Sequence, residues 1–151
     1  MDATIVRPVF FMENFGTPWF LPAIQKGTLA LPMRPDRKLA MVTVDNIGEL
    51  VAKAFLNPDK YIGQAIDLGG DELTLPETMS IVSTAAGKPI GYQALPHKGS
   101  DKIFGHDFAM MFNWFDEIGY KVDYNMLRNE HGLNLTRFAE YIKTADWLGR
   151  V

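Results

Sequence analysis

The feature that most constrains this chain is an apolar segment close to its first residue. In "TIVRPVFFMENFG" (4–16), six of the eight residues from Ile5 to Met12 are apolar. Such a run, rich in β-branched and aromatic residues, is typical of a strand buried on both faces in a parallel sheet. We therefore predict a buried strand over 4–12 that needs neighbours on either side.

Strand and helix patterns alternate along the rest of the chain. Further short strands are predicted at 39–44, 64–70 and 90–96. Helices are predicted at 45–56, 74–87, 101–119 and 136–147, with a short broken helix from 14 to 27 and a loop at 28–38. This alternation indicates an α/β fold with parallel crossovers, and 151 residues suit a single domain, 1–151.

The predicted helices have recognisable ends and apolar faces. Asp45 is the expected N-cap of the first long helix, and Thr74 with Glu77 has the spacing of a capping box. Gly87 is the expected C-terminal stop. The predicted inward-facing residues are Ile47, Leu50, Val51, Ala54 and Phe55; Leu75, Met79, Val82 and Ala86; Phe104, Phe108, Met111, Phe115 and Ile118; and Phe138, Ala139 and Ile142.

The helix at 101–119 is apolar on two sides, which is unusual for a surface helix. Met110 and Trp114 lie on the face opposite Phe108 and Phe115. The run "FAMMFNWF" is expected to be mostly core. The alternative is that its second face covers a ligand pocket or a partner, which makes Trp114 a candidate contact for a second ligand.

Composition excludes several classes of function. The net charge is −3 and no face is rich in Lys or Arg, so nucleic acid is not an expected partner. The chain has no Cys, which excludes a disulfide framework and a thiol nucleophile. No apolar run approaches the ~20 residues that cross a bilayer, and no signal peptide is recognisable. We expect a cytoplasmic protein with no membrane contact.

Charged residues show no catalytic or metal-binding pattern. His97, His106 and His131 are expected to be surface histidines, and Asp71-Glu72 a solvated turn. The basic residues within 28–38 are expected to be solvated as well. No nucleophile, base and orienting group are grouped by spacing, so we predict no catalytic residue and no metal site in this chain.

Three segments together have a recognisable order. They are "TIVRPVFFMENF", "MVTVDNIGELVAKAFLNPDKYIGQAIDLGGDELTLPETMSIVS" and "FAMMFNWFDEIGY…LNLTRFAEYI". They resemble the C-terminal half of NmrA-like proteins, atypical members of the short-chain dehydrogenase/reductase group. The resemblance extends from Thr4 to about Ile142.

The resemblance implies a Rossmann-type fold that binds NADP or NAD, with a small C-terminal lobe. The strand that carries "RPVFFMEN" belongs late in that sheet, with its C-terminal end at the nicotinamide side of the cofactor, where open α/β sheets bind ligands. By match to the family motif, Pro8, Val9, Phe10 and Phe11 are expected to line the cofactor. Met12 and Asn14 are expected to lie towards a second, small-molecule ligand.

The chain departs from the family pattern in its phosphate site and active-site motif. The family's glycine-rich turn after the first strand is absent, and "LGGDE" (68–72), the only glycine pair, follows a late strand. None of the five tyrosines begins a Tyr-x-x-x-Lys motif. We therefore expect a C-terminal portion that lacks the N-terminal Rossmann half and binds no cofactor tightly by itself.

Two functions remain open at this level. The chain is expected to supply one wall of a redox sensor, regulator or small-molecule reductase. Alternatively, it is a free-standing, non-catalytic oligomerisation or protein-interaction module, because an apolar strand left at a sheet edge invites pairing. The expected partner is a second copy or a complementary N-terminal half. A complete small enzyme has the least support.

Overall fold

The apolar segment near the start of the chain forms two short strands in the computed structural model, which describes residues 2–151. They are β1 (Ile5–Pro8) and β2 (Phe10–Phe11), and a 3-10 helix, η1 (Met12–Gly16), follows. The prediction of one strand buried on both faces is wrong for β1: Ile5 is 50% exposed, and exposed Arg7 pairs with Asp67 at 2.7 Å. Among the described residues β1 has a strand partner on one side only, which leaves its other edge exposed.

Parallel pairs dominate the three small sheets, as the alternation predicts. The pairs are β1 with β5 (Ala65–Leu68), β2 with β4 (Lys38–Val42), and β3 (Thr28–Leu31) with β7 (Gly91–Ala94). One further strand, β6 (Asp71–Thr74), pairs antiparallel with β4. The predicted α/β fold with parallel crossovers is therefore confirmed, with one antiparallel addition.

Two of these strands replace predicted loops. The segment 28–38 begins with β3, whose Leu29 and Leu31 are buried in the core; its prolines come only after the strand ends. Asp71 begins β6 rather than a solvated turn, and its carboxylate accepts a hydrogen bond from the Phe138 backbone amide at 2.8 Å. Both predictions failed because the partners of these strands are distant in the chain: β3 pairs with β7, and Asp71 contacts Phe138.

The helices are mostly short. They are α1 (Leu21–Gln25), α2 (Val44–Leu56), α3 (Pro58–Tyr61), α4 (Leu75–Ala86), α5 (Ser100–Phe104), α6 (His106–Glu117), α7 (Tyr124–Asn129) and α8 (Phe138–Tyr141), with 3-10 turns η2 (Ile142–Thr144) and η3 (Leu148–Arg150). None of the helices within residues 2–151 has the length and apolar character needed to cross a membrane.

Helix α4 has the predicted ends. Thr74 and Glu77 form a complete capping box, and Gly87 takes a left-handed conformation (φ 66°) at the C-terminus. Helix α2 differs at its N-cap, because Thr43 rather than Asp45 accepts the Asn46 amide. Phe55, predicted to face inward, is 82% exposed.

The two C-terminal helices are shorter than predicted. The segment 101–119 is broken at Gly105, whose φ of 90° is incompatible with a continuous helix, and Ile118 lies exposed beyond the end of α6. Residues 136–147 form α8 and η2 instead of one helix. Phe138 and Ile142 are buried there as predicted, but Ala139 is exposed.

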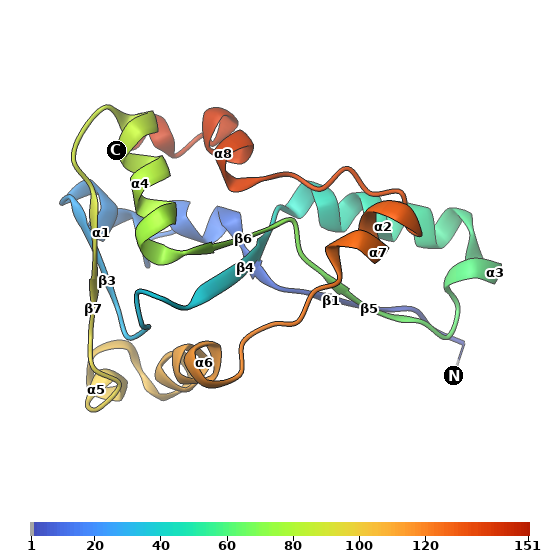
Figure 1. Cartoon of the computed structure of the whole chain (residues 1–151), viewed down its shortest axis with the longest axis horizontal. Helices are drawn as coiled ribbons and strands as arrows, with labels where there is room; N and C mark the ends of the chain where they lie inside the picture. The colour runs from blue at the N-terminus through green and yellow to red at the C-terminus, as the bar shows by residue number, and fades with distance from the viewer. Residues whose placement is uncertain (1) are drawn as a thin grey trace.

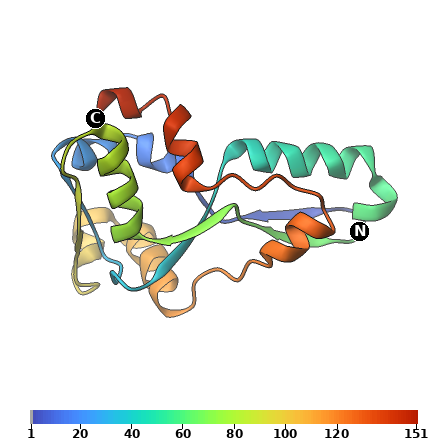
Figure 2. The ribbon, with the colours of Figure 1, turned by 45° about the horizontal axis from the view of Figure 1, so that its top comes forward.

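Two apolar cores lie on opposite sides of the first strands. Phe10 packs in one core with residues of α1, α4 and α6, whereas Val9 and Phe11 pack in the other with residues of α2 and β5. Figures 1 and 2 show the first group at the end of the molecule that holds the C-terminus, and β1, β5, α2 and α7 towards the N-terminus. The alternation of side chains along β2 thus directs Phe10 and Phe11 into different environments.

Candidate functional site

A pocket of about 830 Å³ opens beyond the C-terminal end of β2, and we call it the aromatic pocket. Segments 14–20 and 104–111 form its two sides. Its apolar wall consists of Phe10, Trp19, Phe20, Phe104, Phe108 and Met111. The C-terminal end of a parallel strand is the position where open α/β sheets bind ligands.

Aromatic packing holds this wall together. The Phe10 ring lies 5.9 Å from Phe20 in an edge-to-face arrangement, and Phe20 lies 5.9 Å from Phe108. Phe108 stacks on Phe104 with 5.2 Å between ring centroids. Trp19, by contrast, is 81% exposed at the rim, where it presents a flat apolar surface to a ligand.

Polar groups are few and lie on the two sides of the pocket. Asn14 and Thr17 line one side, where the Thr17 hydroxyl donates to the Asn14 carbonyl at 2.6 Å. His106 and Asp107, both exposed, line the other side at the start of α6. Within residues 2–151 no hydrogen bond engages the side-chain amide of Asn14, which leaves it available to a ligand.

The structure brings two of the seven residues assigned to ligands by sequence, Phe10 and Asn14, into this pocket. Met12 has no exposed surface and lies in the core behind it, and Val9 and Phe11 pack against the opposite core. Pro8 is half-buried at the end of β1. Trp114 lines a separate depression of about 530 Å³ on the outer face of α6. Their roles towards a ligand stay predictions.

Sequence reasoning missed Trp19, Thr17 and Phe104 as pocket residues. The available signal was a tryptophan directly after Pro18, in a segment that cannot form a regular helix. An aromatic residue in such a segment has no helical face to join and is a candidate for ligand contact.

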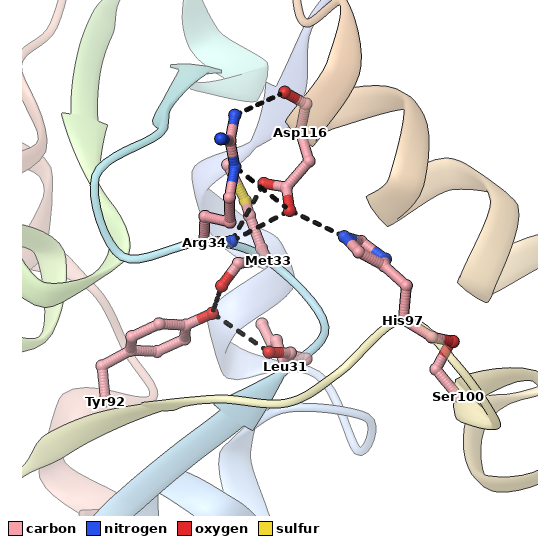
Figure 3. A network of polar contacts seen from close by, with 7 residues as sticks. All are labelled: Leu31, Met33, Arg34, Tyr92, His97, Ser100 and Asp116. Carbon is pink, nitrogen blue, oxygen red and sulfur yellow. Dashed lines mark hydrogen bonds and ion pairs between the residues drawn. The ribbon is translucent and has the colours of Figure 1, made fainter.

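A second feature is a polar cluster around Asp116 of α6 (Figure 3), which we call the Asp116 cluster. Asp116 is buried, and its two carboxylate oxygens accept the Arg34 backbone amide at 2.9 and 3.1 Å. The Nε2 atom of His97 lies 2.7 Å from the same carboxylate. His97 and Arg34 were expected to be solvated, but both contact this buried carboxylate instead; His106 is exposed as predicted.

The cluster contains the residue types of a Ser-His-Asp triad without its geometry. Ser100 is buried, and its hydroxyl donates to the backbone carbonyl of His97 at 2.7 Å rather than to the imidazole. Tyr92 donates to the carbonyls of Leu31 and Met33. Burial raises the pKa of Tyr92 well above its ordinary value, and the negative charge of Asp116 raises it further, so this phenol stays a protonated donor.

His131 is not the surface residue that the sequence predicts. It is 5% exposed and stacks on the Tyr61 ring with 5.4 Å between centroids. Burial lowers the pKa of His131 below its ordinary value of 6.5, and the charge of Lys60 lowers it further. His131 therefore belongs to the core and not to a site.

This buried imidazole predicts a pH dependence of stability. Because its pKa is lower in the folded state, the unfolded chain binds more protons, and stability is lost as pH falls below the ordinary value of 6.5. We expect His131→Gln to weaken this loss. Urea unfolding of both proteins at about pH 7.5 and pH 5.5 measures it. An identical decrease in the two proteins would contradict the assignment.

The fold is α/β, and a pocket lies at residues that follow one of its parallel strands. The chain belongs to the NmrA-like family, whose family model matches residues 2–142. A similar protein is an NmrA-like family domain-containing protein of Dictyostelium discoideum, 28% identical over 97% of this chain and 50% of its own length. The chain thus spans about half the length of this relative. The resemblance to the NmrA-like family that the sequence indicated is confirmed.

Solved structures share the fold. A nucleoside-diphosphate-sugar epimerase of Staphylococcus aureus matches with a TM-score of 0.80 and 20% identity, over 95% of this chain and 52% of that one. The Citrobacter sp. triphenylmethane reductase complexed with NADP(H) gives 0.75 and 15%, over 95% and 53%. NmrA, a negative transcriptional regulator in complex with NADP, gives 0.63 and 17%, over 98% and 56%. These proteins differ in activity, so the shared fold alone assigns none.

Proposed function

We propose that this chain forms the nicotinamide-side wall and the second-ligand lobe of an NAD(P)-binding redox sensor, regulator or small-molecule reductase. The observation that carries the proposal is the aromatic pocket at the end of β2, because Phe10 and Asn14 of the family motif both line it. Two structures that share the fold, a reductase complexed with NADP(H) and a negative transcriptional regulator in complex with NADP, support it. In this proposal the chain is the C-terminal portion of such a protein.

The residues of this chain suit the nicotinamide end of the cofactor and do not suit its phosphates. A flat aromatic wall with a nearby side-chain amide suits a nicotinamide or a planar carbonyl compound. The glycine pair at 69–70 does not suit a phosphate: a Cβ atom on Gly70 would lie 2.7 Å from the Thr136 carbonyl, and one on Gly69 3.2 Å from the Tyr124 hydroxyl. The space beside these glycines is filled by protein.

The chain's own residues would then hold and orient a ligand. The bound cofactor supplies a hydride when a reduction takes place. Phe10, Phe20 and Phe108 exclude water from one face of a planar ligand, and the Asn14 amide can donate a hydrogen bond to its carbonyl oxygen. In this proposal their contribution is to position the ligand, and that this chain supplies no catalytic residue stays a prediction.

Titration of the 151-residue chain with menadione, a planar quinone, and separately with NADPH tests the proposal. We expect menadione to quench the fluorescence of Trp19 and NADPH alone to give no binding heat at micromolar concentration. Trp19→Phe should remove the quenching, and Trp114→Phe, which alters a tryptophan outside the pocket, should keep it. Absence of quenching in the unmodified chain would refute the proposal that the aromatic pocket binds planar ligands. Micromolar NADPH binding would refute the proposal that this chain supplies only one end of the cofactor site.

The exposed edge of β1 favours the alternative, an oligomerisation or protein-interaction module. Next to this edge lies a groove of about 370 Å³ lined by Val6, Val51 and Phe55. Two of its lining residues are exposed apolar side chains, Phe55 (82%) and Ile62 (48%), and the exposed Ile5 (50%) lies on β1 itself. Unpaired strand edges beside apolar surface promote association. A second copy of the chain or a complementary N-terminal half would cover both the edge of β1 and the groove.

Light scattering at tens of micromolar distinguishes this alternative. A dimer that dissociates when Val6→Lys and Phe55→Asp are introduced together would support self-association through this edge. A stable monomer would argue against the homo-oligomer and leave the complementary half as the proposed partner.

A further inference from the structure

The segment from His97 to Gly119 is attached to the rest of the described chain in an unusual way. It contains α5 and α6, and all of its hydrogen bonds to residues outside the segment join Asp116 to Arg34. Besides the two contacts to the carboxylate, the Arg34 guanidinium donates to the Asp116 carbonyl at 3.2 Å. A single residue therefore makes the whole polar attachment of this segment.

The same carboxylate also joins the two ends of the segment. His97 precedes α5 and Asp116 lies near the end of α6, and the 2.7 Å contact between them spans the helical pair (Figure 3). Asp116 thus holds together α6, the connection after β3 and the connection after β7. With a side chain only 5% exposed, its charge depends on these contacts for compensation.

This segment forms one side of the aromatic pocket. Phe104, Phe108 and Met111 line the pocket from α5 and α6, whereas Phe10, Asn14 and Trp19 line it from the first part of the chain. Apart from Asp116, the two sides are joined by apolar contacts, such as Phe20 with Phe108 and Phe10 with Phe115 at 6.2 Å. Apolar contacts are non-directional, so they permit sliding that a buried, directional hydrogen-bond cluster prevents.

We propose that Asp116, anchored by Arg34 and His97, is a positioning residue that sets the distance between the two sides of the aromatic pocket and thereby its affinity for planar ligands. Asp116 does not line the pocket and acts through α6. The inference rests on the proposed ligand role of the pocket, but its structural part can be measured without any ligand.

Amide hydrogen exchange of Asp116→Asn tests the structural part. The substitution retains the shape of the side chain but removes the charge and one acceptor for Arg34 or His97. We expect exchange in residues 98–119 to become at least about tenfold faster while β1, β4 and β5 keep their protection. Asp67→Asn, which removes an exposed carboxylate paired with Arg7, is the matched control and should leave 98–119 unchanged. No change in Asp116→Asn, or a uniform increase over the whole chain, would overturn the proposal.

Menadione affinity tests the functional part. His97→Ala should weaken binding about tenfold, and His97→Gln, whose amide can still donate to Asp116, should restore most of it. This pair also tests the inference if Asp116→Asn fails to fold. Faster exchange in 98–119 with unchanged affinity would overturn the positioning role. If the unmodified chain binds no menadione, the proposed function fails, whereas the exchange result still supports or overturns the attachment itself.

Discussion

Phe10→Ala is expected to lower the free energy of unfolding by about 3–5 kcal/mol and to abolish ligand binding in the aromatic pocket. Phe10 is 6% exposed and contacts three other aromatic rings, those of Phe15 (5.6 Å), Phe20 (5.9 Å) and Phe115 (6.2 Å). Its removal creates a cavity between β2, η1, α6 and the residue that precedes α1, because rings held by three different segments cannot all move into the space. Urea unfolding and menadione titration measure the two effects.

The neighbouring phenylalanine provides the control. Phe11 lies on the opposite face of the same strand, is half-buried and packs against the other core. Phe11→Ala is expected to cost about 1–2 kcal/mol, since a partly exposed ring loses less burial, and to leave menadione binding intact. Equal effects of the two substitutions on menadione binding would show that the pocket is not the binding site.

Gly16→Ala is expected to destabilise the fold by about 3 kcal/mol, at the upper end of the usual cost of overpacking. A Cβ atom at this position would lie 2.3 Å from Cδ1, 2.6 Å from Cγ and 2.9 Å from Cβ of Trp147. The Trp147 ring cannot move away easily, because it is 4% exposed and its indole N–H donates to the Tyr141 hydroxyl at 3.0 Å. The substitution therefore forces the C-terminal segment away from η1, and thermal or urea unfolding detects the loss.

Two further variants isolate the cause of this effect. Gly48→Ala places the same methyl group in α2, where nothing lies within 4 Å, and is expected to stabilise the helix by up to about 1 kcal/mol. Trp147→Leu should reduce the cost of Gly16→Ala by at least about 1 kcal/mol in a double-mutant cycle, since the two sites are in contact. Strictly additive effects would show that the clash is relieved elsewhere.

Features with local causes were predictable from the sequence. The ends of α4 follow from Thr74, Glu77 and Gly87, whose side chains or conformation act within one helical turn. The alternation of apolar strands and amphipathic helices was sufficient for the α/β fold and its parallel crossovers. The family motif at the first strand also identified Phe10 and Asn14, two residues of the pocket.

Features that depend on distant partners were not predictable in this way. Strand β3 looks like a loop because its pairing with β7 joins residues such as Thr28 and Gly91, far apart in the chain. His131 becomes a core residue only through its stacking on Tyr61. The helical spacing of apolar residues continues across Gly105, so it did not predict that this residue, with a φ of 90°, divides α5 from α6.

For this protein, periodicity and short motifs were enough to establish the α/β fold, the ends of α4 and the family, and the motif at the first strand contains two residues that line the aromatic pocket. The shape of that pocket depends on tertiary contacts. Arg34 and Asp116 are 82 residues apart, and His97 and Asp116 are 19 apart, yet they meet at one buried carboxylate. A local sequence pattern does not predict these contacts, because the carboxylate needs hydrogen-bond partners only when it is buried, and it is buried only in the folded chain.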